Sequence, residues 1–199
     1  MKKVCSAFSQ SAAELKELRS VIVTGLLIAL SMVIEGFTIN LGFAKINFAF
    51  LAIAAIGMLY GPSVSFFAGA ICDVLGYLVA PDGAFFPLYT LIGAAQGLIY
   101  GLIAYRKYVK RTGSPRLGEV MIRLFIARIL DVVVINLICN TAANFHYGFL
   151  SDRTVGAAIA ARVAKNLIEL PFDLILIAAI LPAVLAAYEQ VFKKQRISA

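Results

Sequence analysis

Six long apolar runs, separated by short polar stretches, limit the possible folds of this chain more than any other feature. A helix needs about 20 mostly apolar residues to cross the hydrocarbon core of a bilayer. The runs therefore predict an all-α integral membrane bundle of six transmembrane helices, at about 19–39, 46–60, 63–79, 86–105, 118–139 and 155–188. No long repeat, linker or low-complexity tract divides the chain, so we expect residues 1–199 to form a single membrane domain.

The composition agrees with burial in lipid rather than with a soluble core. Hydrophobic residues make up 61% of the chain, whereas about 45–50% is usual for soluble domains. A net charge of +7 is compatible with nucleic acid binding, but the basic residues cluster between the apolar runs. We therefore expect a lipid bilayer, and no nucleic acid, as the environment of this chain.

Lysine and arginine predict the orientation of the bundle, because loops rich in these residues usually remain in the cytoplasm. If both termini are cytoplasmic, the outer loops contain only Lys45 and Arg153, and the other lysines and arginines between the helices are inside. No small-residue cleavage site follows the first apolar run. We therefore expect this run to remain as a helix rather than to act as a cleaved signal.

Small residues recur at helical spacing in two of the expected helices. Gly93, Gly97 and Gly101 lie every fourth residue in the helix at 86–105. This spacing lets two helix backbones approach closely, and here it predicts packing within the bundle. Gly25 and Ala29 have the same spacing in the first helix, where the alternative is docking to another membrane protein.

Seven charged residues fall at membrane depth, where one charge near the centre costs about 2.5–3.5 kcal/mol on insertion scales. We therefore expect them to face the bundle interior, to pair, or to line a wet cavity. The pattern suggests pairs of Arg128 with Asp131 and of Lys165 with Glu169, and a position for Asp173 that faces water near the inner surface. The seven residues are Asp73, Arg128, Asp131, Arg162, Lys165, Glu169 and Asp173.

Hydrogen-bond donors gather toward the outer ends of the fifth and sixth helices. If the sixth helix enters from outside, its first charged residues reach the same level as polar residues at the end of the fifth helix and in the loop that follows. A group of hydrogen-bond donors at this level suits an anionic polar solute that arrives from outside. The polar residues are Asn136, Asn140, Thr141, Asn144, Arg162, Lys165 and Asn166.

Aromatic residues lie in the expected outer loops or at helix starts, and they include Phe86, Tyr89 and Phe145. They form either an interfacial belt of the kind common in membrane proteins or walls that stack on a flat ring. The sequence leaves both interpretations open.

Motifs for covalent, nucleotide or metal chemistry are missing from the sequence. The chain has no GxxxxGK[ST], HExxH, GxSxG or GxGxxG. Cys5, Cys72 and Cys139 are far apart and form no CxxC, so we expect no disulfide and no metal site. His146, the single histidine, falls in an expected outer loop without a cysteine or carboxylate cluster. We therefore expect a protein that is not an enzyme and needs no cofactor.

The order and spacing of short motifs across nearly the whole chain give a family resemblance. The chain resembles the S components of energy-coupling factor (ECF) vitamin importers, and most closely the folate-specific ones. The motifs are Lys45-Ile46, Tyr60-Gly61-Pro62, Asp73 to Leu78 with Pro81 and Gly83, Phe85-Phe86-Pro87 with Tyr89, Asn140-Thr141, Tyr147-Gly148, and Arg162 with Lys165-Asn166.

The resemblance implies a subunit that binds one vitamin near the outer face of a bacterial cell membrane. Such a subunit has no ATPase of its own and docks on a membrane scaffold (T) protein with two ATPase subunits, which bind the ATP. A small-residue motif on the first helix contacts the scaffold in this family. Gly25 and Ala29 match that motif, and Val33 stands where a further small residue is expected.

The resemblance also implies a ligand site on the last three helices and the outer loops, with folate as the expected ligand. A pterin edge would suit Asp73, and glutamate carboxylates would pair with Arg162 or Lys165. The alternatives are an S component for a different vitamin and a self-sufficient small secondary carrier. The expected ligand residues are Asn140, Arg162, Lys165, Asn166, Asp73, Phe86, Tyr89, Asn144, Lys45 and Phe145, which replaces a tryptophan of the relatives.

Overall fold

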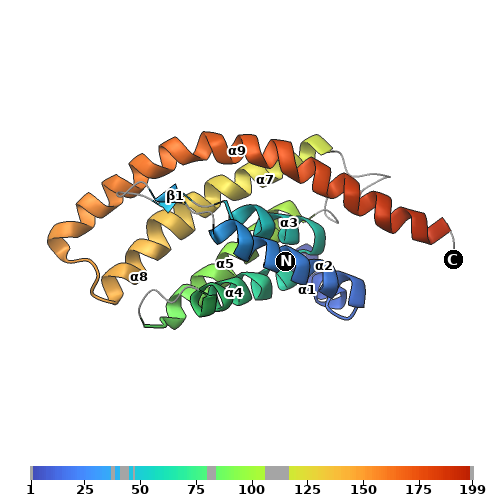
Figure 1. Cartoon of the computed structure of the whole chain (residues 1–199), viewed down its shortest axis with the longest axis horizontal. Helices are drawn as coiled ribbons and strands as arrows, with labels where there is room; N and C mark the ends of the chain where they lie inside the picture. The colour runs from blue at the N-terminus through green and yellow to red at the C-terminus, as the bar shows by residue number, and fades with distance from the viewer. Residues whose placement is uncertain are drawn as a thin grey trace.

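The computed structural model describes residues 2–36, 39–40, 45–46, 48–79, 84–105 and 117–197, and this part of the chain is almost entirely helical (Figure 1). Strands β1 (Ile39–Asn40) and β2 (Lys45–Ile46) form a short antiparallel pair, with Asn40 opposite Lys45. The helices are α1 (Lys2–Glu14), α2 (Leu18–Gly36), α3 (Phe50–Tyr60), α4 (Pro62–Val79), α5 (Pro87–Ala104), α7 (Leu117–Asp131), the π-helical η1 (Val132–Cys139), α8 (Asn140–His146) and α9 (Asp152–Ile197).

Four of the described helices are long and apolar enough to cross a membrane, namely α2, α4, α5 and the part of α9 at 154–191. Helix α3 is apolar but has only 11 residues, and the segment expected at 118–139 is divided between α7 and η1. An all-helical bundle with apolar, membrane-length helices is therefore confirmed. Six spans and cytoplasmic termini remain predictions.

The short helix α3 forms the centre of the bundle. All eleven of its residues are buried, and it contacts α2, α4, α5, α7 and α9. A helix that is apolar on every side is buried on every side, and the sequence of α3 contains no charged residue. The main hydrophobic core is built around it, with Ile56 and Met58 fully buried.

Helices α4 and α5 pack with their backbones in contact. A Cβ added at Gly97 would lie 1.9 Å from the Ser65 carbonyl oxygen, and one added at Gly69 would lie 2.1 Å from the Gly93 carbonyl oxygen. Any larger side chain at these positions would force the two helices apart. The glycines at 93, 97 and 101 therefore serve packing within the bundle, as the sequence predicted.

Between the helices expected at 118–139 and 155–188 the sequence predicts a polar loop, Asn140 to Thr154, and its first half is instead helix α8. No glycine or proline precedes Gly148 in this segment, so the helical backbone of α7 and η1 continues. Gly148 has a φ of +77°, which is the left-handed conformation that ends helices. Helix α9 likewise continues through Pro171 and Pro182.

Helix α1 was not expected from the sequence, and it packs on the beginning of α4. The residue before α4 is Gly61, which has no side chain to cap the helix. Ser11 of α1 takes this role, because its Oγ accepts the backbone N–H of Ser63 at 3.0 Å and of Val64 at 3.2 Å. The Ser63 hydroxyl in turn donates to the Phe8 carbonyl at 3.0 Å.

Replacing Ser11 with alanine is expected to lower the free energy of unfolding by about 1 kcal/mol, as removal of an N-cap side chain does. Ser11 is fully buried, so water cannot replace the lost acceptor. Thermal unfolding in detergent measures the change. Ser9→Ala, an exposed position on the same helix, is the control and should leave stability unchanged; equal effects of the two substitutions would contradict the capping role.

Candidate functional site

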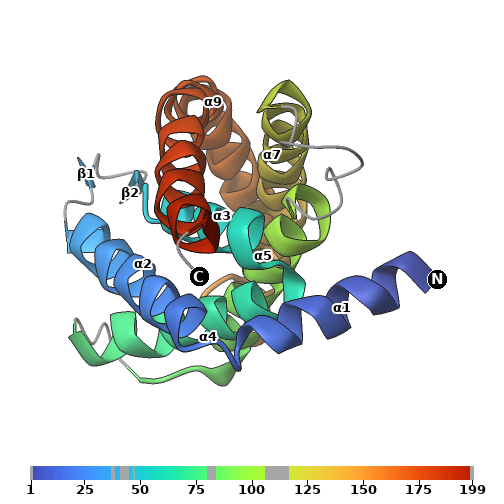
Figure 2. The same cartoon turned by 90° about the vertical axis from the view of Figure 1, so that its right-hand side faces the viewer.

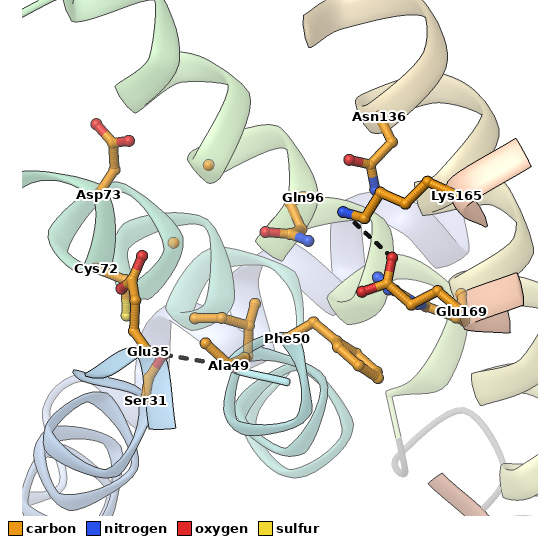
Figure 3. A pocket seen from close by; sticks show the side chains of 14 residues that line it. Ser31, Glu35, Ala49, Phe50, Cys72, Asp73, Gln96, Asn136, Lys165 and Glu169 are labelled. Atoms are coloured by element: carbon orange, nitrogen blue, oxygen red, sulfur yellow. Dashed lines mark hydrogen bonds and ion pairs between the residues drawn. The ribbon is translucent and has the colours of Figure 1, made fainter. Parts of the chain in front are cut away.

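A polar cavity of about 250 Å³ lies inside the bundle, between α2, α3, α4, α5, α7, η1 and α9 (Figure 3). Ligand sites are usually concave pockets of a few hundred Å³ with a small number of polar groups, so this cavity is the candidate binding site. It is lined by Ser31, Glu35, Ala49, Phe50, Ile53, Gly69, Cys72, Asp73, Gly93, Gln96, Arg128, Asn136, Lys165 and Glu169.

Carboxylates from two helices line one side of the cavity. Asp73 comes from α4 and Glu35 from the end of α2, and Figure 3 shows both on the side opposite Lys165. Thr90 of α5 donates its hydroxyl to Asp73 Oδ2 at 2.6 Å. Glu35 lies close to Gly76, because a Cβ added there would be 3.3 Å from Glu35 Oε2. This side therefore offers hydrogen-bond acceptors to a ligand.

Lys165 and Glu169 of α9 form an ion pair on the opposite side (Figure 3). Lys165 Nζ lies 3.3 Å from Glu169 Oε2, and the two side chains are 24% and 4% exposed. The pair predicted from their spacing of one helical turn is confirmed. Lys165 is half-buried and lines the cavity beside Asn136, so its remaining N–H groups can reach a ligand.

Arg128 of α7 forms a buried ion cluster with two carboxylates at the cavity wall. Its guanidinium lies 2.7 Å from Asp131 Oδ2 and 2.7 Å from Asp173 Oδ2, and all three side chains are nearly fully buried. The pair of Arg128 and Asp131 is thus confirmed as an ion pair. The expectation that Asp173 faces water is wrong: it lies on the bundle-facing side of α9 and has no exposed surface.

Neighbouring helices hold this cluster in position. The Arg128 guanidinium lies 3.8 Å from the centroid of the Phe50 ring on α3, a favourable cation–π distance. From α5, Gln96 donates to Asp131 Oδ2 at 3.1 Å and Tyr100 donates to the same oxygen at 3.3 Å. The cluster therefore joins α3, α5, α7 and α9 at one point in the core.

Arg162 lies one turn before Lys165 on the same face of α9. Its Nη1 donates to the Asn136 carbonyl at 2.9 Å, and within the described part of the chain no carboxylate pairs with it. Asn166 is 6% exposed, and no described group bonds its Oδ1; the same is true of Thr141 Oγ1. Polar atoms without a described partner are thus present on both α8 and α9.

An aromatic cluster joins the beginning of α5 to the end of α8. The rings of Phe86 and Tyr147 are 4.4 Å apart, and those of Tyr89 and Tyr147 are 5.9 Å apart. The Tyr89 hydroxyl donates to Asn144 Oδ1, and the Leu88 N–H donates to the Tyr147 hydroxyl at 3.3 Å. These rings therefore form one cluster in which each ring packs on a neighbour.

The structure brings only part of the expected set of ligand residues together. Asp73 and Lys165 line the cavity. Arg162 and Asn166 lie beside Lys165 on α9 without lining the cavity. Phe86 and Tyr89 belong to the aromatic cluster, to which Asn144 is hydrogen-bonded. Half-buried Asn140 begins α8, and Phe145 is 48% exposed. The backbone of Lys45 lies in β2, and its side chain is outside the described residues. The expected docking residues Gly25, Ala29 and Val33 are all exposed on α2.

Sequence reasoning missed Ser31, Glu35 and Gln96 as cavity residues. Ser31 and Glu35 are one turn apart on α2, and Gln96 interrupts the small and apolar residues of α5. Polar residues at membrane depth usually have a function or a partner, and that signal was present for all three. Their shared location depends on how three helices pack, which the sequence does not show.

Membrane-length helices around a polar cavity are the architecture expected of a membrane-embedded binding protein. Residues 19–181 match the model of the family described as ECF transporter, substrate-specific component. The chain belongs to this family, which confirms the resemblance inferred from its motifs. The members of this family are described as transporter components, not as enzymes.

Individual relatives agree with this assignment. The chain is 30% identical to the folate transporter FolT of Clostridium novyi over 82% of this chain and 88% of the relative. It is 33% identical to FolT of Leuconostoc mesenteroides over 78% of this chain and 80% of the relative. The crystal structure of FolT bound with folic acid superposes with a TM-score of 0.68 at 27% identity, over 84% of this chain and 95% of that one.

Proposed function

We propose that this chain captures folate, or a close relative of folate, at the outer face of a bacterial plasma membrane. It then delivers the vitamin to the cytoplasm together with a membrane scaffold (T) protein and two ATPase subunits. The observation that carries the proposal is the cavity, whose opposite sides carry acceptor and donor groups inside a family whose relatives are named folate transporters.

The size of the cavity suggests which part of folate it holds. At about 250 Å³ it is slightly smaller than the usual range of about 300–1,000 Å³ for ligand pockets. A flat bicyclic pterin ring suits this volume, whereas the whole molecule with its glutamate tail would need more room. We therefore infer that the ring enters the cavity and that the tail extends toward the neighbouring polar groups of α9 and α8.

The two sides of the cavity suit the two edges of a pterin. The amino group and ring N–H of a pterin are donors, which a carboxylate can accept in pairs. Asp73 is the better acceptor of the two, since Thr90 fixes one of its oxygens at 2.6 Å. Gln96 and Lys165 on the other walls offer donors to the pterin carbonyl.

Arg162 is the residue we assign to the glutamate tail. Arg128 already pairs with two aspartates and Lys165 already pairs with Glu169. Arg162 donates one hydrogen bond to a backbone carbonyl, and a guanidinium has five N–H groups. It therefore retains donors in the fork geometry that binds a carboxylate in two places.

The ligand test is purification of the chain from a bacterial membrane, followed by the ultraviolet spectrum and mass of any small molecule that purifies with it. A pterin spectrum, and saturable binding of added folate, are expected. A different vitamin would leave the family role intact and overturn the folate assignment. Uptake of solute by the chain alone, in vesicles without ATP, would point instead to a self-sufficient carrier.

Replacing Lys165 with alanine is expected to weaken folate binding more than tenfold, because loss of one partner of a buried charged contact costs a few kcal/mol. The substitution leaves Glu169, which is 4% exposed, as an unpaired carboxylate at the cavity wall. Titration calorimetry measures the change. Lys165→Met combined with Glu169→Gln removes both charges and should recover part of the affinity; an unaffected Lys165→Ala would remove this pair from the site.

The exposed face of α2 supports docking to the scaffold protein. A Cβ added at Gly25 meets no atom within 4 Å, and Ala29 lies one turn further on the same exposed face. Gly25→Trp is expected to reduce recovery of the complete transporter in a pull-down of the scaffold. Ile122→Trp on α7, where the native side chain is 60% exposed, is the control and should leave recovery unchanged.

A further inference from the structure

Helix α1 lies outside the region that matches the family model, which begins at residue 19. The chain nevertheless folds α1 and attaches it to the start of α4 through Ser11. We propose that α1 is an in-plane membrane helix that binds an anionic lipid surface, and that Ser11 fastens it to the bundle. In the orientation proposed above, this surface is the cytoplasmic leaflet.

The short link to α2 places the end of α1 at the membrane surface. Helix α1 ends at Glu14 and α2 begins at Leu18, and three residues span at most about 10 Å. Leu18 and Ile22 are 74% and 52% exposed, which is expected of side chains that face lipid. Figure 2 shows α1 running out to one side of the bundle, with its N-terminal end projecting past the other helices.

The surface of α1 divides into three faces. Ala7, Ser11 and Glu14 are buried against the bundle, with exposures of 2%, 0% and 7%. At 100° per residue, Phe8 and Ala12 lie on one side of this docked face, and the exposed residues Ser6 and Gln10 lie on the other. A helix with an apolar flank and a polar flank is suited to the boundary between lipid and water.

The charge around α1 favours an anionic surface. Lys2 and Lys3 open the helix, and the exposed residues Lys16 and Arg19 follow it, with one exposed acidic residue, Glu17, between them. Glu14, the acidic residue within α1, is buried and accepts a hydrogen bond from Ser20 at 2.9 Å, so it adds little to the exposed charge. Basic residues beside a membrane helix are attracted to anionic headgroups.

Spin labels on opposite flanks of α1 test the proposal in the full chain. Ala12→Cys and Gln10→Cys are made separately after Cys5, Cys72 and Cys139 have been replaced by alanine. Both positions are exposed, so both variants should fold. In vesicles that contain phosphatidylglycerol, we expect the Gln10 label to be at least about threefold more accessible to a water-soluble nickel complex than the Ala12 label.

Lipid charge and the scaffold protein provide the controls. Vesicles of phosphatidylcholine alone, or a Lys2→Glu and Lys3→Glu variant in anionic vesicles, should reduce the contrast between the two labels. Equal nickel accessibility of both labels in anionic vesicles would overturn the proposal, as would protection of Ala12 only when the scaffold protein is added. The measurement needs no vitamin, so its result is independent of the folate assignment.

Discussion

Replacing Arg128 with methionine is expected to lower the free energy of unfolding by about 3–5 kcal/mol, the usual effect of breaking a buried ion pair by removing one partner. The substitution leaves Asp131 and Asp173 with no cation at 2.7 Å, and neither side chain has any exposed surface. It also removes the guanidinium from the Phe50 ring. Unfolding in detergent, followed by circular dichroism, measures the loss.

The same helix offers a matched control for this prediction. Arg123 pairs with Glu119 at 2.9 Å, but the two side chains are 34% and 46% exposed. Because exposed pairs contribute about 0–1 kcal/mol, Arg123→Met should change stability little.

Adding Asp131→Asn and Asp173→Asn to Arg128→Met should restore much of the loss, since neutral replacements of a buried ion cluster are often tolerated. Equal effects of Arg123→Met and Arg128→Met would contradict the assignment.

Arg162→Met is expected to weaken folate binding about thirtyfold or more, because hydrogen bonds to charged groups contribute about 1.5–3 kcal/mol. The residue is half-buried and donates to the Asn136 carbonyl, so its loss leaves the α9 backbone and the buried ion cluster in place. Titration of the purified variant with folate measures the change, and thermal unfolding should show near-native stability.

The choice of ligand separates a contact with the tail from a general defect. A pterin without the glutamate tail should bind Arg162→Met and the native chain equally if, as we propose, Arg162 pairs only with the tail. Arg162→Lys should restore part of the folate affinity, since lysine retains the charge without the planar fork. A parallel loss of pterin and folate binding would place Arg162 at the ring instead.

The apolar pattern was sufficient to predict the helical membrane class, because lipid requires every backbone polar group to be bonded within a helix or a closed barrel. A charge that faces lipid is also costly, so the charged residues at membrane depth were expected to pair or to line a cavity. The pairs Arg128–Asp131 and Lys165–Glu169 followed from helical spacing alone. The glycine spacing likewise predicted close packing of α5, and the motif order identified the family.

Other features depended on contacts between segments distant in the sequence. Asp173 pairs with a residue 45 positions earlier, so its local sequence could not reveal its burial. Ser11 caps a helix that begins about fifty residues later, and no rule of spacing connects the two.

The sequence by itself therefore determined that this chain is a helical membrane protein of the ECF substrate-specific family with charges inside it. The tertiary structure decided which of those charges neutralise one another and which have no partner of opposite charge among the described residues. Side-chain spacing within one helix determines which residues share a face, but only the packing of several helices determines what that face meets. For that reason Arg128 belongs to the core of the bundle, whereas Arg162 bonds a backbone carbonyl and pairs with no described carboxylate.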